Sequence, residues 1–158
     1  MQLQQAKKAD RFLVPAINIV ESVAALVGIW DFIVYPYRFS WFNVVGLISF
    51  VFGVSMYLKA RLTLGKFFSE KLRLLETHKL VTSGIYRHIR HPIYAAEMLL
   101  LLGFTLMLNS LLGFLVMLLF VPLILIRIPF EEAMLKEACS QQYNDYIKQT
   151  KKLIPLLY

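Results

Sequence analysis

The sequence predicts an all-α membrane protein: a polytopic bundle of about four transmembrane helices with an amphipathic helix near the C-terminus. Of the 158 residues, 58% are hydrophobic and only 17% are charged, whereas soluble domains carry about 25% charged residues. The basic residues are bunched between apolar runs, which is typical of the cytoplasmic loops of membrane proteins. Although the net charge is +7, this bunching also argues against nucleic-acid binding.

Four apolar segments are candidates for the membrane-spanning helices: residues 12–34, 41–58, 93–108 and 111–126. A spanning helix needs about 20 apolar residues, and about 17 at the least. The last two segments are short, and only Asn109 and Ser110 separate them. They therefore form either a tight hairpin in a thinned part of the bilayer or a hairpin that crosses it incompletely. Pro122 predicts a kink in the fourth segment.

The number of lysine and arginine residues is alternately high and low in the successive segments that flank the apolar runs. Three precede the first segment, one lies between the first two, eight lie in residues 59–90, none lies in the turn at 109–110, and five lie from residue 127 onward. The positive-inside rule then predicts four spans with both termini in the cytoplasm. The first segment holds Glu21 and lacks a small-residue cleavage site, so we expect a retained helix and not a secretory signal. The expected location is the inner membrane of a prokaryote or the endoplasmic reticulum of a eukaryote.

The segments outside the spans are amphipathic. Residues 59–84 mix cations with leucine and phenylalanine, which suits the membrane interface. Residues 130–150 place apolar side chains at helical spacing, and Pro155 is expected to help end that helix. Without a repeat or linker, residues 1–158 form one domain, divided into N-terminal helices (1–74) and a second half (75–158). Cys139 is the only cysteine, so an intramolecular disulfide and a cysteine-based metal site are excluded, and we expect no metal.

Three acidic residues fall within the apolar segments, where a charge costs about 2.5–3.5 kcal/mol on insertion scales. Glu21 shares a helical face with Asn18 and is the deepest of the three. Asp31 is expected at the outer interface, in contact with water. Glu97 lies about one turn inside the membrane boundary, where it pairs with a basic residue such as Arg90 or serves the function; both alternatives stay open.

Polar residues also gather at the ends of the third and fourth segments. His91 and Pro92 precede the third segment and suit a helix N-terminus, because proline favours the first helical turn. Arg127 closes the fourth segment, and Glu131 follows at i+4 on the same helical face. Pro129 lies between them and predicts a helix break, which argues against a simple ion pair between the two.

Two motifs on either side of the predicted hairpin resemble one family. The pattern G-x-Y-x-x-x-R-H-P-x-Y is followed by R-x-x-x-E-E-x-x-L, then Y-x-x-Y and a closing basic-L-I-P. Residues 75–158 thereby resemble the isoprenylcysteine carboxyl methyltransferase-like family, integral-membrane enzymes that use S-adenosylmethionine and are related in their C-terminal half to phospholipid N-methyltransferases. The chain departs from the family pattern at Ala96 and at Cys139-Ser140, where glycine and Phe-Gly are frequent. The matching positions are Gly84, Tyr86, Arg90, His91, Pro92, Tyr94, Arg127, Glu131, Glu132, Leu135, Tyr143, Tyr146 and residues 152–155.

The resemblance implies a methyltransferase with a cytoplasmic pocket for S-adenosylmethionine. It implies that His91, Tyr94 and Glu131 line this pocket, with Glu132 and Tyr86 as further candidates. Carboxylates suit the amino group and ribose of such a cofactor, and aromatic faces suit its adenine and sulfonium. Methyl transfer requires no metal, and a carboxylate acceptor requires no general base, so positioning and desolvation would dominate catalysis.

Arg90, Glu97 and Arg127 are the residues expected to decide the acceptor. Arg127 suits the carboxylate of a lipophilic, membrane-embedded substrate, because a guanidinium binds carboxylates bidentately and stays charged in a low dielectric. An amine acceptor would instead require Glu97 or Glu132 to take a proton. Two alternatives therefore accompany the carboxyl methyltransferase: a phospholipid or lipid amine N-methyltransferase, and a non-catalytic membrane scaffold or transport protein that binds no cofactor. The sequence does not predict the oligomeric state.

Overall fold

The computed structural model describes residues 2–35, 39–69 and 80–153, and these are almost entirely helical. Five α-helices and two short 3₁₀ helices follow one another, and no strand is found in these ranges, only an isolated bridge between Ile89 and Lys151. The predicted all-α class is thus confirmed. The elements are α1 (Gln2–Val34), α2 (Trp41–Leu64), η1 (Gly65–Phe67), η2 (Gly84–Arg87), α3 (Pro92–Met107), α4 (Leu111–Met117) and α5 (Phe120–Gln149).

Three helical segments of the described chain are long and apolar enough to cross a membrane: Gln4–Val34, Trp41–Phe67 and Leu111–Gln149. The fourth apolar helix, α3, has 16 residues and is therefore about 24 Å long at 1.5 Å per residue. A hydrocarbon core of about 30 Å exceeds this length. The chain is an integral membrane protein in which the third apolar segment is the short one, whereas the fourth continues into the long helix α5.

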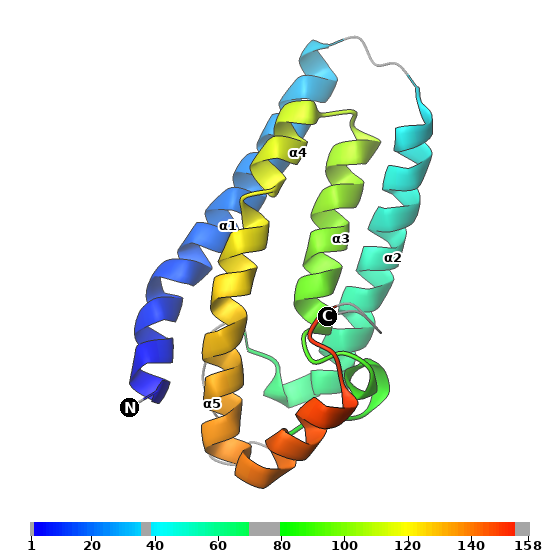
Figure 1. The fold of residues 1–158 in the computed structure, drawn as a ribbon. Helices are drawn as coiled ribbons and strands as arrows, with labels where there is room; N and C mark the ends of the chain where they lie inside the picture. Colours follow the sequence, from blue (N-terminus) through cyan, green and yellow to red (C-terminus); the bar gives the residue numbers. More distant parts are fainter. Residues whose placement is uncertain (1, 36–38, 70–79, 154–158) are drawn as a thin grey trace.

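The helices place the predicted loops at opposite ends of the bundle (Figure 1). The start of α1, the end of α2, the start of α3 and the end of α5 lie at one end, and the end of α1, the start of α2 and the α3–α4 turn lie at the other. Polar contacts tie this second end together: the Ser40 hydroxyl donates to Asn109 Oδ1 at 3.1 Å, and the Ser110 hydroxyl donates to Asp31 Oδ2 at 2.6 Å. Asp31 is only 8% exposed, so the expected contact with water is wrong.

Glycines bring α2 and α3 into backbone contact. A Cβ atom on Gly103 would lie 2.4 Å from the Phe50 nitrogen, and one on Gly46 would lie 2.4 Å from the Met107 nitrogen. Gly53 continues this contact one level lower, where a Cβ would lie 2.9 Å from the nitrogen of Leu100. In lipid, small residues allow such close approach, and van der Waals packing then holds the helices together. This pairing fixes the position of α3 against α2.

The prolines of the last segment behave differently from one another. The helix is interrupted between α4 and α5, just before Pro122, whose missing N–H would otherwise bond to the carbonyl of Leu118. Pro129, in contrast, lies inside α5 without a break, so the predicted break at Pro129 is wrong. The helix bends further on, at Ser140, where φ is 34° and ψ is −104°. The predicted helix over residues 130–150 is therefore the continuation of the fourth apolar segment. Pro155 lies outside the described residues.

Candidate active site

A cavity of about 310 Å³ lies at the end of the bundle where α1 and α3 begin. Its walls come from α1, α2, α3 and α5 and from the segments around η1 and η2. Six of the eight predicted site residues line it, namely Tyr86, Arg90, Tyr94, Glu97, Arg127 and Glu131. His91 and Glu132 are absent from the described lining and lie behind it, in contact with Glu131 and Arg90. The two halves of the sequence motif thus meet in space.

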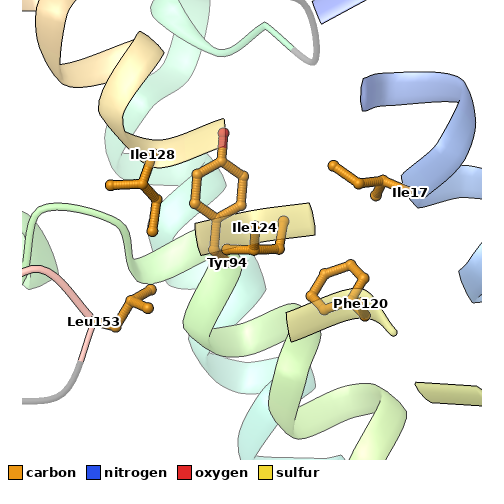
Figure 2. Close-up of a cluster of buried hydrophobic side chains, with 6 residues drawn as sticks. All are labelled: Ile17, Tyr94, Phe120, Ile124, Ile128 and Leu153. Atoms are coloured by element: carbon orange, nitrogen blue, oxygen red, sulfur yellow. The ribbon is translucent and has the colours of Figure 1, made fainter. Parts of the chain in front are cut away.

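Tyr94 joins the apolar core to the polar wall of the cavity. Pro92 occupies the first turn of α3, so Tyr94 follows in that same turn. Its ring packs in a cluster that includes Ile17 and Ile128, while its hydroxyl points away from these side chains (Figure 2). This hydroxyl donates a hydrogen bond of 2.6 Å to Glu131 Oε2. A rigid aromatic ring therefore holds the carboxylate of Glu131 at the cavity wall.

His91 lies between Glu131 and Glu132 of α5. His91 is 4% exposed, and its ring stacks on the Tyr94 ring at a centroid distance of 5.7 Å. Nδ1 lies 3.7 Å from Glu131 Oε2, and Nε2 lies 3.3 Å from Glu132 Oε1. His91 also precedes Pro92 as the cap residue of α3. The two sequence interpretations of His91, helix terminus and site residue, are therefore compatible.

Arg90 fastens the end of α5 to the start of α3. Its Nε donates to Glu132 Oε1 at 2.9 Å, and one terminal nitrogen donates to the carbonyls of Ile147 and Thr150. The backbone repeats this attachment, because the Arg90 nitrogen donates to the carbonyl of Lys151 at 2.8 Å. The His91 nitrogen likewise donates to the carbonyl of Lys152 at 3.0 Å, so Lys151 and Lys152 lie beside the segment that opens the motif.

Tyr86 is buried at the cavity wall, and its backbone carbonyl accepts a 2.7 Å hydrogen bond from the hydroxyl of Tyr146. Burial of the phenol, with smaller contributions from Glu131 and Tyr146, raises the pKa of Tyr86 well above its ordinary value. The hydroxyl of Tyr86 therefore stays protonated near neutral pH.

Arg127 has a partner that the sequence did not predict. Its Nε lies 3.0 Å from Asp10 Oδ1, and the two residues are 7% and 5% exposed. The guanidinium carbon also lies 5.6 Å from the centroid of the Tyr94 ring, within reach of a cation–π interaction. Asp10 stands among Lys7, Lys8 and Arg11 in the sequence and resembles an ordinary interfacial charge. Only the packing of α1 against α5 identifies it.

Helix α1 supplies one wall of the cavity. Val14 and Ile17 contribute apolar surface. Asn18 and Glu21, which the sequence predicts on one helical face, contribute polar groups. Glu21 and Glu97 thus line the same space, from α1 and α3 respectively. Two of the three acids in the apolar segments therefore belong to the cavity, as polar groups within spanning helices commonly do, whereas Asp31 lies at the other end of the bundle.

Comparison with known proteins places the chain in a family. Residues 41–142 match the model of the phospholipid methyltransferase family. The chain is 31% identical over 120 residues to protein-S-isoprenylcysteine O-methyltransferase B of Arabidopsis thaliana, an alignment that covers 74% of this chain and 61% of that protein. It is 30% identical over 123 residues to protein-S-isoprenylcysteine O-methyltransferase of Mus musculus, which covers 76% of this chain and 44% of that protein.

A solved structure shares the fold. The eukaryotic intramembrane Ras methyltransferase isoprenylcysteine carboxyl methyltransferase superposes with a TM-score of 0.75 at 27% identity, over 90% of this chain and 53% of that one. The alignments thus cover between 44% and 61% of the length of these three proteins. The family match begins at Trp41, at the start of α2, and leaves α1 outside. From the family match, the relatives and the shared fold together, the chain belongs to the phospholipid methyltransferase family and is an isoprenylcysteine carboxyl methyltransferase-like member of it.

Proposed function

We propose that this protein transfers a methyl group from S-adenosylmethionine to the carboxylate of a lipophilic acceptor that lies in the membrane. One observation carries the proposal: a single cavity between the apolar helices brings Tyr94 and Glu131 of the cofactor motif close to Arg127. The names of the relatives, which describe O-methylation of S-isoprenylcysteine, support a carboxylate acceptor with an isoprenyl-like tail.

The residues at the cavity fit the proposed cofactor. One oxygen of Glu131 is held by Tyr94, and for the other, Oε1, no partner is found among the described residues. That oxygen is available to an ammonium group or a ribose hydroxyl. Aromatic rings, including Tyr57, Phe67 and Tyr86, offer faces to an adenine and a sulfonium. A volume of about 310 Å³ is at the lower end of the range of about 300–1,000 Å³ for ligand sites.

Glu131 and the aromatic rings of the cavity would hold the cofactor, which would supply a methyl group on a cationic sulfur that leaves with the electron pair of the broken bond. Arg127 orients the acceptor carboxylate, because its guanidinium faces the cavity and keeps its charge in low dielectric. The surrounding helices exclude water from the acceptor oxygen, which strengthens its interaction with Arg127. A carboxylate is already deprotonated, so no side chain has to remove a proton.

His91, Glu132 and Arg90 act by positioning in this proposal. Arg90 holds Glu132, Glu132 holds His91, and the His91 ring stacks on the Tyr94 ring. The chain of contacts ends at Glu131, which would touch the cofactor.

Methylation of a lipid amine is the second candidate, and Glu97 favours it. This carboxylate lines the cavity, whereas Glu132 is behind the lining and is held by Arg90 and His91. An amine must lose a proton on methylation, and Glu97 would be the group to accept it. The family description, phospholipid methyltransferase, is in line with such an acceptor.

Product chemistry separates the two candidates. The protein in lipid nanodiscs is given methyl-labelled S-adenosylmethionine with N-acetyl-S-farnesylcysteine or with phosphatidylethanolamine. We expect label in the farnesylcysteine product that base releases as methanol, because an ester hydrolyses and an N-methyl group does not. Glu131→Gln should abolish incorporation, and Glu137→Gln, on the exposed part of the same helix, should retain it. Base-stable label in the lipid alone would establish the amine reaction instead.

A further inference from the structure

The ion pair between Asp10 and Arg127 joins α1, a helix outside the family match, to the arginine of the motif. Asp10 belongs to α1 (Gln2–Val34), and the match covers residues 41–142. Both side chains are buried, the Nε–Oδ1 distance is 3.0 Å, and Arg127 faces the cavity while Asp10 is not part of the described lining. The carboxylate of Asp10 thus pairs with Arg127, the same residue that is proposed to bind the carboxylate of the acceptor.

The charges around Arg127 make this arrangement consequential. Glu21, Glu97 and Glu131 also line the cavity, so an acceptor carboxylate would enter a space that is already rich in carboxylates. In a low dielectric, a further anion next to an ion pair is repelled by the anion of that pair. An acceptor carboxylate therefore binds Arg127 at full strength only when Asp10 gives up its contact.

We propose that Asp10 competes with the acceptor for Arg127: it holds Arg127 before the acceptor binds, yields it to the acceptor carboxylate, and regains it after methyl transfer. This inference rests on the proposed carboxyl methylation. The transfer converts an anionic carboxylate into a neutral ester, and no proton moves. A charge-assisted hydrogen bond to a guanidinium is about twice as strong as a neutral one. Asp10 therefore displaces the ester from Arg127, although it does not displace the acid, and the product is released.

Asp10→Asn tests the exchange, because asparagine keeps the size of the side chain and an oxygen for Arg127 but removes the competing charge. We expect the KM for N-acetyl-S-farnesylcysteine to fall about tenfold, which corresponds to about 1.4 kcal/mol. The inhibition constant of its methyl ester should fall as well, and kcat should decrease because the product leaves more slowly. Asp10→Glu, which keeps the charge, should stay close to wild type. Asp145→Asn removes an exposed carboxylate that pairs with Lys148, and serves as the matched control.

A purely structural role for Asp10 predicts the opposite sign. A KM that rises in Asp10→Asn, or that stays within twofold of wild type, would overturn the exchange. Titration with S-adenosylhomocysteine shows whether the variant has folded. Hydrogen–deuterium exchange of wild type provides a measurement without a variant: the acid should increase exchange in the first turns of α1 and the ester should not, and equal exchange with both would contradict the proposal. A wild type that binds the cofactor but methylates no acid would overturn the proposed function and the exchange together.

Discussion

Replacing Gly103 by alanine should separate α2 from α3 and destabilise the protein. The new Cβ would lie 2.4 Å from the Phe50 nitrogen and 2.7 Å from the Gly46 carbonyl oxygen, whereas ordinary contacts begin at 3.4 Å. The difference, 3.4 − 2.4 = 1.0 Å, must come from backbone movement, because both opposing atoms belong to the main chain of α2. Overpacking of this kind costs about 1–3 kcal/mol, and two backbone contacts place Gly103→Ala at the upper end.

Thermal unfolding in detergent measures this effect, followed by the fluorescence of Trp30 and Trp41. We expect the Tm of Gly103→Ala to fall by at least about 5 °C, since about 2–4 °C accompanies each kcal/mol in chains of this size. The affinity for S-adenosylhomocysteine should also fall, because α3 carries Tyr94 into the cavity wall.

Gly28→Ala is the matched control. A Cβ at Gly28 would meet only the side chains of Leu108 and Phe104, each at 3.4 Å. Alanine is favoured over glycine within a helix by about 1 kcal/mol, so the Tm of Gly28→Ala should equal or exceed that of wild type. A Gly103→Ala protein that unfolds at the wild-type temperature would refute the reasoning, because α2 and α3 could then not be in backbone contact.

Three further substitutions probe the site. Tyr94→Phe removes the 2.6 Å hydrogen bond to Glu131. Because a hydrogen bond to a charged group contributes about 1.5 kcal/mol or more, we expect calorimetry to show an affinity for S-adenosylhomocysteine that is about tenfold lower. Unchanged affinity would remove Glu131 from the cofactor site. Arg90→Gln leaves Glu132 without its guanidinium partner, so thermal unfolding should reveal a loss of about 3 kcal/mol, and an unchanged Tm would contradict the attachment of α5 to α3. Gly84→Ala places a side chain at φ 59°, where L-residues pay about 1 kcal/mol or more; a Tm equal to wild type would argue against this turn conformation.

The membrane fold was predictable from sequence because its determinants are local. Apolar runs and clustered basic residues appear along the chain itself, and the helix ends expected on opposite sides of the membrane do lie at opposite ends of the bundle. Which end faces the cytoplasm stays a prediction. The prolines show the limit of local signals: Pro122 coincides with a break, whereas α5 accommodates Pro129 and bends at Ser140, which carries no turn signature in the sequence.

The candidate site was predictable only as far as the motif reaches. Tyr94, Arg127 and Glu131 meet at the cavity as the two-part motif suggested, although their roles there stay proposals. The contacts of Asp10 and Asp31 were not predictable, because each depends on a helix distant in the sequence. The backbone contact between α2 and α3 could not be predicted for the same reason. Its glycines stand singly within apolar runs, and their purpose becomes visible only when the two helices are placed side by side.

Calorimetric titration of the purified protein with S-adenosylhomocysteine, in lipid nanodiscs, tests the central claim most directly. We predict saturable one-site binding that Glu131→Gln weakens strongly and that Glu137→Gln leaves unchanged. Folded wild-type protein that binds neither this compound nor S-adenosylmethionine would contradict the account and would favour a non-catalytic membrane protein.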